Sequence, residues 1–298
     1  MTQGGPDHQG SLPGLSAQEA AALAGRHGLE HVGVRPPLPV YVRDLFRHRH
    51  FIWTMSEAGF ISRHQNNYLG LFWSVLNPLL LGAAYYLIFG LLLETTRGVD
   101  NFIAFLTAGL FTFIFISAGF NYAAKSMVDS TGLVRALRFP RAILPISVSI
   151  TELIATVPAF LILLVLCLAT GEDPSVKWLL FPVALLIVGL ITLGIGLIAA
   201  RIVHAARDVG NLIPLLTRML RYVSGIFFPI ANYAGEGWIS VVLLYQPIAV
   251  SLQMVRESLM GEFPLDPVTW VVSLAWGVLL TGIGFVFFWR AEATYGRA

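Results

Sequence analysis

The chain alternates long apolar stretches with short polar connections, a pattern typical of helices that cross a membrane several times. A helix needs about 20 predominantly apolar residues to span a hydrocarbon core of about 30 Å. Five stretches meet this requirement plainly, at residues 70–93, 102–124, 142–169, 177–203 and 267–289. We predict a sixth span over 209–229, because the segment is long enough and the sides assigned to the surrounding loops require a crossing there. Arg218 and Arg221 lower the hydropathy of this segment. The predicted fold class is therefore an all-α integral membrane protein with six transmembrane helices.

Three segments outside these spans have patterns of their own. Residues 41–64 intersperse large apolar side chains with arginine and histidine, which predicts an N-terminal amphipathic helix in the interface plane. Residues 126–141 combine a short apolar ridge with arginines and predict a cytoplasmic docking helix. Residues 230–264 contain two apolar pieces of about 10 residues, too short to cross a bilayer, so we expect re-entrant external helices between the fifth and sixth spans.

The first 40 residues differ in composition from the rest of the chain. Residues 1–40 are rich in Gly, Pro, Ser and Gln and lack the apolar core of a signal peptide. This composition favours a mobile cytoplasmic tail, which leaves residues 41–298 as the membrane domain.

Composition and charge agree with this interpretation. The chain is 56% hydrophobic and 12% charged, with a mean hydropathy of +0.73, which excludes an ordinary soluble protein. Lysine and arginine predict the orientation, because cytoplasmic loops carry more of them. One side holds Arg35, Arg43, Arg47, Arg49, Arg63, Lys125, Arg135, Arg138, Arg141, Arg201, Arg207, Arg290 and Arg297. The other side has only Arg97, Lys177 and Arg256, so we expect a multi-pass protein of the bacterial plasma membrane with both termini in the cytoplasm.

The sequence contains no motif for ATP hydrolysis or metal catalysis. It has no glycine-rich phosphate loop followed by lysine, so any ATP and Mg²⁺ must be bound by a partner chain. Six of the seven histidines lie in the tail or the amphipathic segment, and His204 lies at a helix end, with none of the spacings that zinc hydrolases use. We expect no catalytic site, metal or cofactor in this chain, and no nucleic acid among its partners.

Three charged residues are predicted at membrane depth, where each costs at least ~2.5 kcal/mol on insertion scales. Glu152 lies in the third span, while Arg218 and Arg221 lie one turn apart in the fifth. One interpretation is a structural ion pair between neighbouring helices. The other is that the arginines line a transport path and bind an anionic diphosphate headgroup, because guanidinium matches phosphate geometry. A third hypothesis, an intramembrane transferase using Glu152, is weakened because no second acid or histidine lies at comparable depth.

Aromatic residues form a second candidate lining for a path. Rings within the spans can stack on the CH-rich faces of sugars, although packing against lipid explains each ring individually. The candidates are Tyr85, Tyr86, Phe89, Phe113, Phe120, Tyr122, Phe227 and Phe228.

Several strings, taken together, resemble the permease subunits of ABC exporters for O-antigen, teichoic acid and galactan-type polysaccharides. RHQNNYLGLFWSVLNPLL (Arg63 to Leu80) is similar to that family's entry into the first span, and FPRAILPIS (Phe139 to Ser147) to the boundary after its linker. Further resemblances lie at ARDVGNLIPLL with FFPI, at QPIAVSLQMVRESLMG and at the closing FWRAEATYG. The resemblance covers roughly residues 41–297.

This resemblance implies a non-enzymatic permease that forms a homodimer and binds two copies of an ABC ATPase subunit. The dimer would export a polyprenyl-diphosphate-linked polysaccharide through a channel. The residues assigned to ATPase docking are Arg47, Arg49, Arg135, Arg138 and Phe139. An exporter of a drug or small lipid on the same scaffold remains the alternative.

Overall fold

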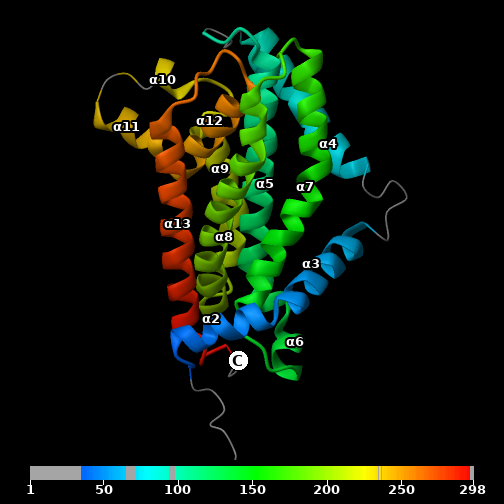
Figure 1. Cartoon of the computed structure of the whole chain (residues 1–298), viewed down its shortest axis with the longest axis vertical. Coiled ribbons are helices and arrows are strands. Elements are labelled where there is room, and N and C mark those ends of the chain that lie inside the picture. Colours follow the sequence, from blue (N-terminus) through cyan, green and yellow to red (C-terminus); the bar gives the residue numbers. More distant parts are fainter. Residues whose placement is uncertain (1–34, 65–71, 94–97, 234, 236, 296–298) are drawn as a thin grey trace, which may run out of the picture. The chain divides into compact units, whose positions relative to one another are not determined.

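The computed structural model describes residues 35–64, 72–93, 98–233, 235 and 237–295, and this part of the chain forms helices and turns without strands (Figure 1). The all-α fold class is confirmed. The elements are α2 (Leu38–Arg47), α3 (Arg49–His64), α4 (Phe72–Tyr85), η1 (Tyr86–Leu92), α5 (Phe102–Asp129), α6 (Thr131–Ala136), α7 (Ile143–Ala169), η2 (Val176–Leu180), α8 (Phe181–Ala205), α9 (Val209–Val223), α10 (Ile230–Tyr233), α11 (Trp238–Tyr245), α12 (Pro247–Leu259) and α13 (Pro267–Arg290).

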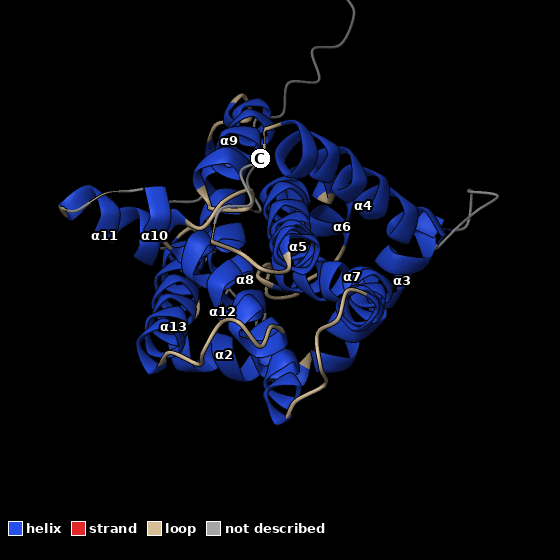
Figure 2. Ribbon diagram, turned by 90° about the horizontal axis from the view of Figure 1, so that it is seen from above, coloured by secondary structure: helices blue, strands red, loops and turns tan. Residues whose placement is uncertain are grey.

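Five helical stretches are long and apolar enough to cross a membrane, and they coincide with the five plainly predicted spans. They are Phe72–Leu92, Phe102–Asp129, Ile143–Ala169, Val176–Ala205 and Pro267–Arg290. The helix α5 lies at the centre of the bundle, as Figure 2 shows, and most of its residues are buried. The helices α4, α7, α8, α9 and α12 pack against it, whereas α13 packs against α8 and α12, so α5 carries much of the apolar core.

Small residues let α8 and α13 approach closely. A Cβ atom added to Gly284 would lie 2.5 Å from the carbonyl oxygen of Gly194, closer than any real contact allows. Membrane helices gain van der Waals contact in this way, because lipid supplies no hydrophobic drive for their association. The pairing fixes α13 against α8 over the middle of the bundle.

The predicted span at 209–229 is shorter than expected. The helix α9 ends at Val223 after 15 residues, about 22 Å at 1.5 Å per residue, which is less than the hydrocarbon thickness. It ends there because Gly225 adopts a left-handed conformation with φ of 73°, which suits glycine and interrupts a helix. The described residues therefore provide five long spans, and a sixth only if the bent pair α11–α12 is counted as one.

The segment predicted as re-entrant forms short helices with a sharp break. The helices α11 and α12 meet at 65° around Gln246 and Pro247, because proline disfavours a helical conformation in the residue before it. Residues from Ile248 to Leu259 are almost all buried. Irregular backbone at membrane depth is tolerated where protein covers it, and α12 meets that condition within the described bundle.

Two predicted boundaries shift at the end of the bundle that carries the C-terminus. The predicted segment 41–64 forms two helices, α2 and α3, separated at His48, and α2 already begins at Leu38, inside the predicted tail. Residues 1–34 of that tail lie outside the described residues. The predicted docking helix 126–141 is reduced to α6, because α5 continues without a helix breaker as far as Asp129.

Candidate functional site

Five of the predicted channel residues come together, with four aromatic side chains around one arginine. Nη1 of Arg221 donates a hydrogen bond of 3.0 Å to the hydroxyl of Tyr85, and the guanidinium carbon lies 5.6 Å from the ring centre of Phe113. The ring of Phe227 stacks on Phe89 at 4.2 Å and meets Tyr85 edge-on at 4.8 Å. These five residues, called the arginine–aromatic cluster below, connect α4, η1, α5 and α9 with the turn that follows α9.

The guanidinium of Arg221 is only partly satisfied by this cluster. Its Nε is buried and has no hydrogen-bond partner among the residues that the structure describes. Leaving a buried donor unpaired costs about 1–3 kcal/mol, and more for a charged group. The cluster therefore holds a cation that can still donate a hydrogen bond to an anion.

Arg218 lies one turn earlier on a part of α9 that the single chain leaves open. Its side chain is exposed and makes no hydrogen bond or ion pair with any described residue. The neighbouring exposed side chains are large and apolar: Leu212, Leu215, Leu216, Met219, Tyr222 and Val223. A face that combines these side chains with an arginine is unsuited to plain lipid contact, since a charge at membrane depth normally faces a protein or wet interior.

Glu152 has a different partner from the one considered in the sequence analysis. The buried carboxylate forms an ion pair with Arg63 of α3, not with Arg218 or Arg221. The guanidinium of Arg63 also lies 4.0 Å from the ring centre of Tyr122. Tyr122 therefore lies beside the Arg63–Glu152 pair and is not one of the five residues of the arginine–aromatic cluster.

The other predicted aromatic residues take separate positions. Tyr86 packs near Phe102, with ring centres 6.4 Å apart, and Phe228 packs against the main core while partly exposed. Phe120 and Phe113 line an apolar cavity of about 360 Å³ between α5, α8 and α9. The ring of Phe113 therefore connects this cavity with the arginine–aromatic cluster.

The predicted docking arginines are accessible, whereas the predicted docking phenylalanine is not. Arg47, Arg49, Arg135 and Arg138 are exposed. Phe139 is buried and meets Phe51 of α3 edge-on at 5.4 Å. Its position gives it a packing role between α3 and the segment after α6.

A buried polar junction near the chain's C-terminal end was missed in the sequence analysis. The Tyr41 hydroxyl donates to Oε2 of Glu292 at 2.8 Å and accepts from the amide of Ala142 at 3.0 Å. Oε1 of Glu292 accepts from the backbone N and from Nη1 of Arg141, at 3.1 and 3.2 Å. The junction joins α2, the start of α7 and the segment after α13. Its one sequence signal was the closing string that contains Glu292.

Burial dominates the electrostatics of this junction. Desolvation raises the pKa of the Glu292 carboxyl above its ordinary value of 4.5, against the opposing hydrogen bonds from Arg141 and Tyr41. Burial likewise raises the pKa of the Tyr41 hydroxyl, with the nearby Glu292 carboxylate adding to the effect. Tyr41 therefore stays protonated and acts as a hydrogen-bond donor at physiological pH.

The comparisons with known proteins agree with this architecture. Residues 50–260 match the family model for the ABC-2 type transporter. The chain is 28% identical over 254 residues to the O-antigen export system permease protein RfbA of Myxococcus xanthus, covering 85% of this chain and 94% of that protein. It is 25% identical over 232 residues to RfbA of Klebsiella pneumoniae, covering 76% and 86%. It is also 26% identical over 207 residues to the polysialic acid transport protein KpsM of Escherichia coli, covering 65% and 75%.

The family model covers well over half of the chain, including the arginine–aromatic cluster and the bent pair α11–α12. Together with the all-helical fold, this match shows that the chain belongs to the ABC-2 type transporter family.

Proposed function

We propose that this chain is the channel-forming permease of an exporter that moves a lipid-linked polysaccharide out of the bacterial cytoplasm. The names of its relatives support a polysaccharide substrate, since they transport O-antigen or polysialic acid. In this family the ATPase activity lies on a separate subunit, so the chain contributes the path and its partner supplies the energy.

One observation carries the proposal: α9 presents two arginines, of which Arg218 has no polar partner within the described part of the chain and Arg221 is incompletely hydrogen-bonded there. Polyprenyl diphosphate, the proposed lipid anchor, carries a diphosphate that can accept bidentate hydrogen bonds from guanidinium groups. The half-buried rings of Tyr85 and Phe89 beside Arg221 offer stacking surfaces for the first sugars, with the buried ring of Phe227 packed behind them. An anionic headgroup with an attached glycan matches both chemical features.

The open face of α9 also supports a homodimer as the transporting unit. Within the described bundle, α9 buries only one side of its surface. A second copy facing the same helix would enclose Arg218 and its apolar neighbours in a shared interior. In that assembly the two copies form a channel between their α9 helices, with one ATPase bound to each copy.

The exposed arginines near α2, α3 and α6 support the proposed orientation. Arg47, Arg49, Arg135 and Arg138 lie toward the end of the bundle that also carries the C-terminal segment. The positive-inside rule places this end in the cytoplasm, where the ATPase subunits are available for docking.

Depletion of the chain in its native host tests the function. We expect lipid-linked glycan to accumulate in the cytoplasmic leaflet, measured by extraction and by accessibility to an added glycosidase. Re-expression of the wild-type chain should restore export. Unchanged glycan together with altered drug tolerance would contradict the proposal and favour a drug or small-lipid exporter.

A further inference from the structure

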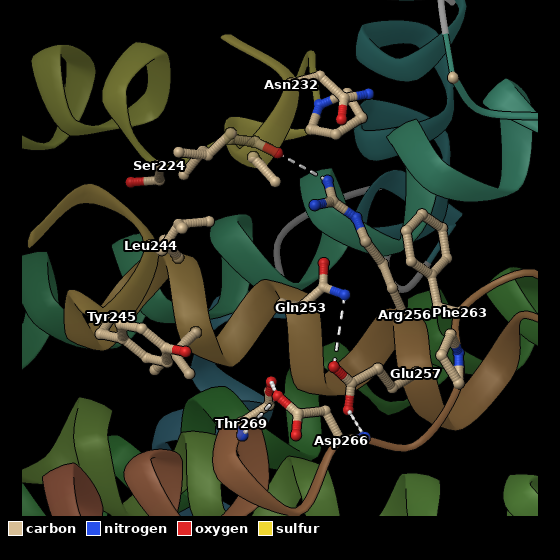
Figure 3. A pocket seen from close by; sticks show the side chains of 18 residues that line it. Ser224, Asn232, Leu244, Tyr245, Gln253, Arg256, Glu257, Phe263, Asp266 and Thr269 are labelled. Atoms are coloured by element: carbon tan, nitrogen blue, oxygen red, sulfur yellow. Dashed lines mark hydrogen bonds between the residues drawn. The ribbon is translucent and has the colours of Figure 1, made fainter. Parts of the chain in front are cut away.

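A cavity of about 340 Å³ with a mixed polar and apolar lining lies beside the bend between α11 and α12, at the end of the bundle opposite to α2. Its walls come from the turn after α9, from α12 and from the loop that leads into α13. Figure 3 shows Gln253, Arg256 and Glu257 projecting from α12, with Asp266 and Thr269 at the start of α13. The volume lies within the range of small-molecule sites.

Arg256 carries a deeply buried charge in the wall of this cavity, with 3% of its surface exposed. Its Nε donates to the carbonyl of Phe105 at 3.2 Å, and its Nη2 donates to the carbonyls of Gly225 and Ile226 at 2.9 and 3.2 Å. The guanidinium carbon also lies 3.5 Å from the ring centre of Phe105. These contacts fix the guanidinium plane, and Nη1 makes no hydrogen bond to the described part of the chain.

No carboxylate neutralises Arg256 among the described residues. The two ion pairs found there join Arg63 to Glu152 and Arg141 to Glu292. Glu257 is adjacent in sequence, but its Oε2 accepts from the amide of Asp266 and from Nε1 of Trp270, both at 3.2 Å. Buried charges are ordinarily paired, so a rigid guanidinium with an open donor indicates a place for a ligand oxygen.

The other walls of the cavity limit the chemistry of that ligand. Glu257 and Asp266 contribute carboxylates that repel a multiply charged anion. A lipid chain is also unsuitable, because the polar groups of the lining would have no hydrogen-bond partner. Gln253 adds an amide whose Nε2 donates a long hydrogen bond of 3.4 Å to Oε1 of Glu257. Tyr245 and Phe263 add aromatic rings. Mixed donors and acceptors with flanking rings suit a ligand that has several hydroxyls and CH-rich faces.

We propose that this cavity binds one sugar unit, with Arg256 Nη1 donating to a sugar oxygen and Gln253 and Glu257 pairing with its hydroxyls. The inference rests on the proposed function, because the sugar is a unit of the exported glycan. Tyr245 ends α11 and Gln253 lies in α12, so a bound sugar contacts both sides of the bend. The cavity thereby serves as a glycan subsite on the exit side of the transporter.

Ligand-observed NMR tests the site on the purified full-length chain in detergent. Saturation transfer is measured with millimolar glucose, galactose, N-acetylglucosamine and glucuronate. Gln253→Leu removes the amide at similar volume without changing any bond of Arg256, and Tyr245→Ala removes a ring. The matched control is Trp238→Ala on the same helix as Tyr245, since Trp238 is 76% exposed and lies outside the cavity.

We expect at least one sugar to give a signal that Gln253→Leu and Tyr245→Ala abolish and Trp238→Ala preserves. No signal with any sugar, or equal signals in all variants, would overturn the proposal. Broadening of the phosphorus resonance of inorganic phosphate without any sugar signal would also overturn it, by assigning the cavity to an anion. The depletion experiment is independent of this assay, so glycan export can be established even if the cavity binds no sugar.

Discussion

Arg63 of α3 and Glu152 of α7 form an ion pair that links the amphipathic segment to a membrane-spanning helix. The Glu152 side chain is 5% exposed, whereas that of Arg63 is 31% exposed and lies over the ring of Tyr122. The carboxylate thus depends on a single cationic partner at the edge of the bundle. This relationship connects a surface predicted to meet the ATPase with the interior of the permease.

Arg63→Ala should destabilise the protein by about 3 kcal/mol, because it leaves a buried carboxylate without its partner. The double variant Arg63→Ala with Glu152→Gln should recover most of this loss, since no unpaired charge remains. Thermal unfolding of the purified chain in detergent measures both. Additive losses in the double variant would contradict a direct pairing.

Gly59 and Thr151 form a second contact between the same helices. A Cβ atom on Gly59 would lie 3.1 Å from Oγ1 of Thr151, and that hydroxyl already donates to the carbonyl of Ser56 at 2.9 Å. Gly59→Leu should therefore separate α3 from α7, at a cost of about 1–3 kcal/mol. We also expect it to reduce export per ATP hydrolysed in the assembled complex.

The neighbouring residue provides the control for this variant. Ala58 is exposed on α3, so Ala58→Leu places the same side chain away from α7. Normal stability and coupling in Gly59→Leu, or equal losses in both variants, would show that this helix contact is unimportant.

Arg218→Ala and Arg221→Ala should each weaken substrate stimulation of the ATPase while leaving the complex assembled. A hydrogen bond to a charged group contributes about 1.5–3 kcal/mol, so half-maximal stimulation should need about 10–100 times more lipid-linked substrate. Tyr85→Phe is the control for Arg221, because it removes one hydrogen bond and keeps the ring. Loss of assembly in size-exclusion chromatography would instead indicate a structural role for the arginines.

Arg135→Glu combined with Arg138→Glu should uncouple ATP hydrolysis from export, because both exposed side chains lie in the predicted docking segment. We expect basal hydrolysis to continue while export falls by at least about tenfold, the effect of ~1.4 kcal/mol. Arg290→Glu is the control, as an exposed arginine outside that segment. Full export in the double variant would place the docking surface elsewhere.

The sequence predicted the long helices well because apolar length alone determines them, and all five plain spans are present. It could not predict the end of α9, which depends on the left-handed conformation of Gly225. The ion-pair partner of Glu152 could not be predicted either, because Arg63 lies 89 positions away in the sequence. Arg256 was counted among loop charges, although α12 is packed inside the bundle. Local patterns identify charged residues, but tertiary packing decides their partners.

The polar junction around Glu292 predicts a specific pH dependence. Because burial raises the pKa of this carboxyl in the folded protein above 4.5, the folded state holds the proton more tightly than the unfolded state. The stabilising contribution is fully present below pH 4.5 and is lost as the pH rises through the raised pKa. Glu292→Gln carries no charge and keeps one oxygen, which can accept from Tyr41 or from Arg141 but not from both, because these residues donate to different carboxylate oxygens.

We therefore expect the melting temperature of Glu292→Gln, relative to that of the wild-type chain, to increase as the pH is raised from 4.5 toward neutrality. Thermal unfolding of both proteins across this range, in one detergent and at constant ionic strength, measures the difference. Asp44→Asn provides a control carboxylate, because Asp44 lies on α2 outside the junction. A constant difference at every pH, or a growing advantage of the wild-type chain, would mean that the hydrogen bonds to the carboxylate outweigh its desolvation.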